Sequence, residues 1–182
     1  MNTLRNILAA AGAAALMAGM ATAANAQSTA SANGTVAASI IQPIAITKNN
    51  DVSFGTVARP NTASTSTVVL DPELAASPVS ISGGTAVIQA QGSRGQFTVT
   101  GDGGRTYGLT GTGAFDLTRA GGTETIEFTP EIVAAAGTLG TLSGTAFGAG
   151  TQVLYAGGEF DITNTTVPGA YTGTLSLTVT YN

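Results

Sequence analysis

The sequence predicts an all-β protein with the architecture of an immunoglobulin-like two-sheet β-sandwich. Apolar and polar residues alternate over short segments, which is the period of a half-buried strand. Turn-forming residues separate these segments, and the chain contains 25 glycines. Charged residues make up only 9% of the chain, well below the typical ~25%, while threonine, serine and valine are abundant. Many short strands with frequent turn signals are typical of a sandwich.

The alternating segments give the expected strands in order. They span residues 36–47, 52–57, 65–70, 79–81, 86–89, 96–100, 107–110, 115–118, 123–129, 153–156, 159–162 and 171–181. Residues 48–51 are expected to form a turn, and Gly101-Asp102-Gly103-Gly104 predicts a β-hairpin between its flanking strands. A single helical turn is expected at residues 131–136. We predict a core that contains Phe97, Val99, Leu175, Leu177 and Val179.

The first 26 residues have the pattern of a secretory signal peptide. Arg5 supplies a positive charge, residues 7–21 are apolar, and Ala24-Asn25-Ala26 is a small-x-small cleavage motif. An N-terminal membrane anchor is the alternative, but the apolar run is shorter than the ~20 residues that span a bilayer. We therefore expect an exported protein, found in the periplasm, at the cell surface or outside the cell, with a mature chain that does not insert into membranes.

Residues 27–39 form an N-terminal extension before the sandwich domain, which we expect at residues 40–182. Small or apolar residues alternate along the extension, as in a strand that pairs with the sheet of another subunit. The candidate donor-strand face consists of Ala30, Ala32, Gly34, Val36, Ala38 and Ile40. The alternative is a disordered tail that follows the signal peptide.

The composition argues against catalysis and against several classes of partner. The chain has no histidine and no cysteine, so the usual bases and thiolate nucleophiles are missing. Glu124, Glu127, Glu131, Glu159 and Asp161 could supply a glycosidase carboxylate pair, but surface positions on strands account for them more simply. We expect no enzyme activity, no cofactor and no metal site. A net charge of −4 also argues against nucleic acid as a partner.

Five spaced motifs resemble a family of exported proteobacterial β proteins that is known mainly as a domain of unknown function. They are residues 43–47 (PIAIT), 51–55 (DVSFG), 95–101 (GQFTVTG) with 106–107 (TY), 155–158 (YAGG), and 169–173 (GAYTG) leading to 179–181 (VTY). The same layout is similar to spore coat protein U and to subunits of chaperone–usher pili. In those families a sandwich that lacks one strand is completed by the N-terminal extension of a neighbour. The chain departs from them because it lacks their cysteine pair.

The resemblance implies a structural subunit of a fimbria-like or coat-like surface assembly that polymerises by strand exchange. Its partners would be neighbouring copies of the chain, with a periplasmic chaperone and an usher as further partners. The alternative from a different class is a free-standing secreted or periplasmic sandwich that binds a ligand, such as a carbohydrate, through its loops. Phe147, in the glycine-rich segment 139–150, is the aromatic residue expected to be exposed there.

Overall fold

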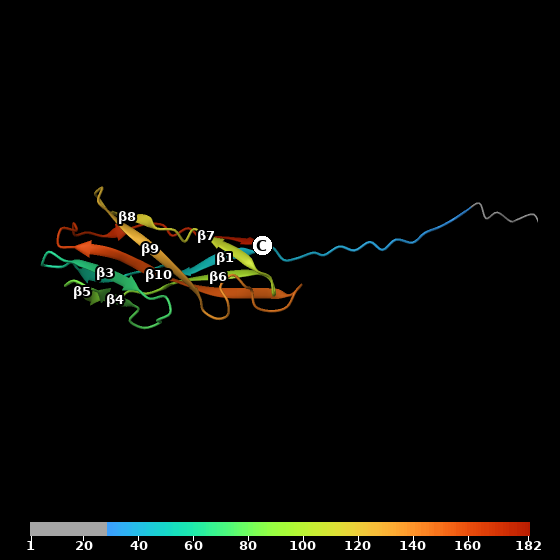
Figure 1. The fold of residues 1–182 in the computed structure, drawn as a ribbon, viewed down its shortest axis with the longest axis horizontal. Helices are drawn as coiled ribbons and strands as arrows, with labels where there is room; N and C mark the ends of the chain where they lie inside the picture. The colour runs from blue at the N-terminus through green and yellow to red at the C-terminus, as the bar shows by residue number, and fades with distance from the viewer. Residues whose placement is uncertain (1–28) are drawn as a thin grey trace, which may run out of the picture. The chain divides into compact units, whose positions relative to one another are not determined.

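The computed structural model describes residues 29–182, and within this range it contains strands and no helix (Figure 1). The all-β prediction is confirmed, and the several sheets form a β-sandwich. The signal peptide predicted at residues 1–26 lies outside the described residues. Residues Ser39–Asn182 form one compact unit.

Twelve strands lie in the described part of the chain. They are β1 (Ala45–Asn50), β2 (Thr56–Ala58), β3 (Thr65–Leu70), β4 (Val79–Ser82), β5 (Val87–Ala90), β6 (Gly95–Asp102), β7 (Tyr107–Thr110), β8 (Phe115–Arg119), β9 (Thr125–Ala134), β10 (Ala149–Thr163), β11 (Tyr171–Thr172) and β12 (Thr178–Tyr181). In Figure 1, β3, β4 and β5 lie at one end of the domain, and β1, β6, β7 and the C-terminus lie at the other.

The main sheet is antiparallel and has the strand order β1-β6-β10-β9-β8-β11. The long strand β10 changes its partner halfway: residues up to Ala156 pair with β6, and residues from Gly158 onward pair with β3. Two smaller pairs, β2 with β5 and β7 with β12, complete the sandwich. The two ends of the main path, β1 and β11, each pair with one neighbour only among the described strands.

Two clusters of buried side chains form the core. The first contains Phe97, Val99, Tyr107, Leu142, Leu154 and Ala156, and the second contains Val68, Leu70, Val79 and Ile162. Phe97 and Val99 are buried as predicted. Leu175, Leu177 and Val179 pack against the first cluster but are half-buried rather than buried as predicted.

The structure corrects the predicted start of the first strand and the turn that was expected to follow it. Residues 29–44 contain no strand, and β1 begins at Ala45. Lys48, Asn49 and Asn50 belong to β1 rather than to a turn, and a register irregularity between Lys48 and Asn50 absorbs the local bend. An alternating sequence becomes a strand only where a neighbour satisfies its main-chain groups, and β6 supplies that neighbour only from Ala45 onward.

The predicted hairpin and the predicted helical turn are also wrong. β6 and β7 do not pair with each other, because β1 and β10 occupy both edges of β6 and β7 pairs with β12. The turn at Gly103-Gly104 therefore carries the chain from one sheet to the other. Residues 131–134 continue β9, where Ile132 and Val133 lie opposite Ala156 and Tyr155 of β10. β-branched residues with a strand beside them favour the extended form.

Candidate functional site: an apolar groove between two open strand edges

A groove of about 1030 Å³ lies between the two ends of the open sheet. One wall is formed by residues 51–59, which continue from β1 through β2, and the other by residues 166–175, which include β11. We call this feature the edge groove. Its walls have unpaired main-chain edges, since β1 and β2 pair only with β6 and β5, and β11 pairs only with β8, among the described strands.

The floor of the edge groove is apolar and rich in aromatic residues. Five of the six phenylalanines in the chain line it, namely Phe54, Phe97, Phe115, Phe128 and Phe160. Phe54 packs edge-on against Phe160 and Phe128, with ring centroids 4.7 and 5.7 Å apart, and Phe115 packs against Phe128 at 5.3 Å. Edge-to-face packing fixes the position of these rings. The floor is therefore a rigid apolar surface.

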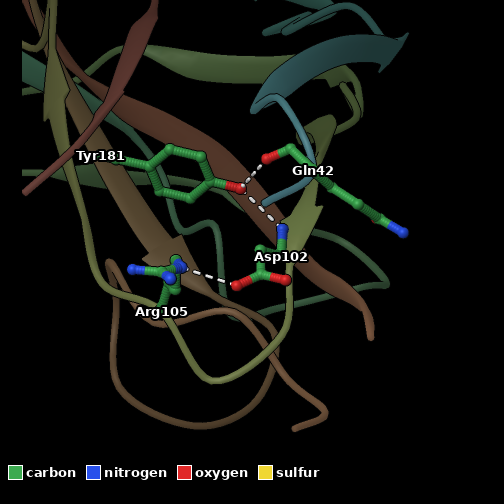
Figure 2. A network of polar contacts seen from close by, with 4 residues as sticks. All are labelled: Gln42, Asp102, Arg105 and Tyr181. Carbon is green, nitrogen blue, oxygen red and sulfur yellow. Dashed lines mark hydrogen bonds and ion pairs between the residues drawn. The ribbon is translucent and has the colours of Figure 1, made fainter. Parts of the chain in front are cut away.

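One polar contact joins the two walls of the edge groove at one end, and another joins the chain segments that continue the walls beyond the lining residues. At one end, the exposed Arg59 donates a hydrogen bond of 2.7 Å from Nη1 to the main-chain oxygen of Thr166. At the other end, the hydroxyl of Tyr181 on β12 donates to the main-chain oxygen of Gln42, 2.8 Å away. The same hydroxyl accepts a hydrogen bond of 2.6 Å from the main-chain nitrogen of Asp102 (Figure 2).

The main-chain nitrogen that binds the Tyr181 hydroxyl belongs to a residue whose carboxylate is buried. Asp102 is completely buried, and its Oδ2 pairs with Nε of Arg105 at 2.6 Å. A paired charge can be tolerated in such a place because the guanidinium compensates for lost hydration. Gly101, next to Asp102, leaves the room in which the Tyr181 hydroxyl sits, since a Cβ at this position would collide with that hydroxyl. Three separate chain segments therefore meet at Tyr181.

The candidate donor-strand face lies outside any strand. Ala30, Ala32, Gly34, Val36, Ala38 and Ile40 are all exposed, and the large apolar side chains of Val36 and Ile40 are 97% and 87% exposed. Their pairing with a sheet stays a prediction. The sequence reasoning missed Arg59 and the Phe54 cluster, although the concentration of phenylalanines in strand segments of a chain without tryptophan was a usable signal.

The carboxylates considered as a glycosidase pair gather on a different surface. Glu124, Glu127, Glu159 and Asp161 line a shallow depression of about 700 Å³ that also contains Tyr171, whereas Glu131 does not line it. Asp161 accepts a hydrogen bond of 2.6 Å from the Thr67 hydroxyl. Arg119 donates a hydrogen bond from Nε to Oε2 of Glu124 at 2.7 Å, and this contact lowers the pKa of the Glu124 carboxyl. Glu124 and Asp161 are thus held by neighbouring side chains.

Among residues 29–182, no group of three or more acidic side chains has a geometry suited to a metal ion. The same range contains no helix of the length and hydropathy that crossing a membrane requires.

Comparison with known protein families identifies the domain. The model of the family described as "Domain of unknown function (DUF4402)" matches residues 44–181. The chain belongs to this family. The match covers every strand of the sandwich and both walls of the edge groove, and it begins just after the N-terminal extension. No curated protein and no solved structure is significantly similar to the chain, so the role of the DUF4402 domain must be inferred from its own geometry.

Proposed function

We propose that this protein is an exported structural subunit of a fimbria-like or coat-like assembly at the cell surface, and that it polymerises by strand exchange. The N-terminal extension of one copy would enter the edge groove of the next copy and complete its sheet. The observation that carries this proposal is that the two unpaired ends of the sheet face each other across an apolar groove. A single inserted strand would pair with both.

The dimensions of the groove and of the candidate strand agree. The wall formed by residues 51–59 is roughly 30 Å long if extended, and a strand from Ala30 to Ile40 is roughly 36 Å long at 3.3 Å per residue, so it can cover the whole wall. Its alternating face has small residues with Val36 and Ile40, which suits a floor already crowded by phenylalanine rings. Fully burying an exposed Val or Ile side chain contributes about 1.5–3 kcal/mol, in addition to main-chain hydrogen bonds along both walls.

Charge also favours this occupant. The N-terminal extension contains no charged residue, and neither do the residues that follow it up to Pro43. Inserting the extension would therefore bury no unpaired charge. The charged residues of the groove are Lys48, Asp51 and Arg59, and Lys48 and Asp51 pair with each other at 2.6 Å on the exposed surface. The interior of the groove is left to apolar contacts.

The resemblance to spore coat protein U and to chaperone–usher pilus subunits supports the same proposal. In those families a sandwich that lacks one strand is completed by a neighbour's strand. An exported domain with an open apolar groove would need protection before assembly, because unpaired strand edges are prone to aggregation. We therefore include a chaperone and an usher among the proposed partners.

Deleting the extension tests the proposal. The exported chain is expected to form concentration-dependent oligomers in light scattering coupled to size exclusion, and a chain that lacks residues 27–39 is expected to be monomeric and less stable. A synthetic peptide of residues 27–40 should bind the shortened chain and raise its thermal midpoint. A shortened chain that stays monomeric with an unchanged midpoint, whether or not the peptide is added, would contradict strand exchange.

A second candidate function rests on Phe147. This residue is 63% exposed and has a backbone φ of +62°, a conformation that is uncommon for a bulky side chain and often marks a binding loop. An exposed aromatic side chain held in this way suits stacking against a sugar ring or an apolar partner. Glycan-array binding that is lost on Phe147→Ala, with assembly intact, would favour a ligand-binding module.

A further inference from the structure

The contact between Tyr181 and Gln42 also bears on which copy of the extension can fill the edge groove. We infer that Tyr181 acts as a latch that denies the groove to the chain's own extension, so that the strand must come from a second copy. This inference rests on the proposed strand exchange. It concerns which copy of the chain supplies the strand, and not how the strand binds in the groove.

The latch lies where the extension leaves the domain. Gln42 is three residues before β1, and its main-chain oxygen accepts a hydrogen bond from Tyr181 on β12, the strand that follows the wall formed by residues 166–175. β1 and β12 are in contact at this end, and Ile44, Ile46, Val179 and Tyr181 pack on the same core cluster. The segments that continue the two walls therefore meet at the latch. The space for another strand opens only between residues 51–59 and 166–175.

Insertion of the chain's own extension would require a hairpin that turns near Gln42. Counting back equally from this turn, residue 36 would lie opposite residue 48, and only residues 25–33 would reach the wall formed by residues 51–59. Residues 34–41 would have to lie beside residues 43–50, in the region where β1 contacts β12. The main-chain oxygen of Gln42 that faces this path is already bound to Tyr181. The segment with Val36 and Ile40 would thus miss the groove.

An extension from a second copy has no such restriction. It can enter from the other end, where, among residues 29–182, the exposed side chain of Arg59 bridges the walls. An exposed arginine side chain can rotate away at little cost, because water replaces its hydrogen bond. At the latch, in contrast, the Tyr181 hydroxyl is also held by the hydrogen bond that it accepts from the main-chain nitrogen of Asp102, a residue that is completely buried. The two ends of the groove are therefore closed with unequal strength.

The test distinguishes strands that cross between chains from strands that stay within one chain. The photo-crosslinker p-benzoylphenylalanine replaces Val36, and equal amounts of ¹⁵N-labelled and unlabelled exported chains are unfolded, mixed and refolded together. Crosslinked peptides that join position 36 to residues 43–59 or to residues 166–175 are then sorted by mass spectrometry into mixed-isotope and same-isotope pairs, so that a same-chain hairpin, which places residue 36 opposite residue 48, is detected as well. We expect the chain with Tyr181 intact to give mixed-isotope pairs in the proportion that random pairing between separate chains produces.

Tyr181→Phe removes the hydroxyl and keeps the ring. We expect the same-chain fraction to rise roughly tenfold, since loss of a hydrogen bond that contributes about 1.4 kcal/mol changes an equilibrium by that factor. Tyr107→Phe is the matched control, because Tyr107 lies opposite Tyr181 in the pairing of β7 with β12, its hydroxyl also donates a hydrogen bond, to Oε1 of Gln152 at 2.6 Å, and it does not line the groove. This control variant should give the same proportion of links between chains as the unaltered chain.

Gly101→Ala provides a second route to the same result, because its Cβ would displace the Tyr181 hydroxyl. Mixed pairs that persist in both folded variants would overturn the latch while leaving strand exchange intact. Variants that both fail to fold, as judged by circular dichroism, would show that Tyr181 is needed for folding rather than for routing, which also overturns the inference. An unaltered chain that gives no links from position 36 to the groove would contradict the proposed function itself.

Discussion

Arg59 and Thr166 lie on opposite walls of the edge groove and are joined by a hydrogen bond of 2.7 Å from the Arg59 guanidinium to the Thr166 main-chain oxygen. This bond uses an acceptor that an inserted strand would need, and its donor is an exposed side chain. Because the bond crosses the open end of the groove, Arg59 is placed to affect how fast a strand can enter.

Replacing Arg59 with alanine should speed assembly. The free Thr166 oxygen becomes available to an incoming strand, and no competing bond must break. We expect the rate at which a fluorescent peptide of residues 27–40 binds the shortened chain to rise severalfold in stopped-flow measurements. Arg94→Ala is the control, since Arg94 lies over the Tyr155 ring and donates to the Pro72 oxygen, away from the groove. A slower rate for Arg59→Ala would instead mean that Arg59 holds the walls in a receptive position.

A charge on the candidate donor face should block assembly, whereas the same charge on the opposite face should not. Val36→Asp would bury an unpaired carboxylate in the groove, which should cost at least about 3 kcal/mol and weaken peptide binding roughly 100-fold. Ala37→Asp places the carboxylate one residue later, on the opposite side of an extended strand. Isothermal titration of both variant peptides would check this, and equal binding by the two would refute the alternating register.

The local period of the strands could be predicted from the sequence, but their pairing could not. The strand around Phe97 and Val99 is recognisable because alternation fixes which side chains share a face. The turn at Gly103-Gly104 looks like a hairpin turn, yet β6 and β7 have other partners. Partner choice is decided by distant residues, and no short window contains them. The same reason explains why an alternating segment before Ala45 is not a strand.

The edge groove was equally beyond local reasoning, although its proposed occupant was not. The rings of Phe54, Phe128 and Phe160 come from three separated segments and meet only after folding. The groove exists because β1 and β11 end the sheet without a strand between them, which is a property of the whole topology. The extension, in contrast, is one continuous segment, so its alternation from Ala30 to Ile40 is visible in the sequence.

Two leucines should report the difference between the core and the groove. Leu154 is completely buried, so Leu154→Ala should lower the free energy of unfolding by about 2–5 kcal/mol. Leu175 is half-buried and lines the groove, so Leu175→Ala should cost the shortened chain less and should weaken binding of the 27–40 peptide. Urea denaturation and peptide titration would measure the two effects. An equal loss of stability with unchanged peptide binding would show that Leu175 belongs to the core instead.

Acid should weaken the wall formed by residues 166–175 through Glu124. The hydrogen bond from Arg119, the largest cause, lowers the pKa of the Glu124 carboxyl from its ordinary value of 4.5. A lowered pKa in the folded state means that the ion pair stabilises the fold above pH 4.5, and that this contribution is lost as the pH falls through the lowered value. Arg119 also lies opposite Tyr171 in the pairing of β8 with β11, and its side chain packs against Gly169.

In the Glu124→Gln variant, stability should therefore fall less than in the unaltered chain when the pH is lowered from 6 to below 4.5. Urea midpoints at several pH values would show a steeper fall below pH 4.5 for the unaltered chain than for the variant, and peptide binding to the groove should follow the same trend. Glu127→Gln is the matched control, because Glu127 lies on the neighbouring strand β9 and has no ion-pair partner among residues 29–182. Parallel curves for the unaltered chain and Glu124→Gln would mean that the Arg119–Glu124 pair, whose side chains are 24% and 38% exposed, is too well solvated to stabilise this wall.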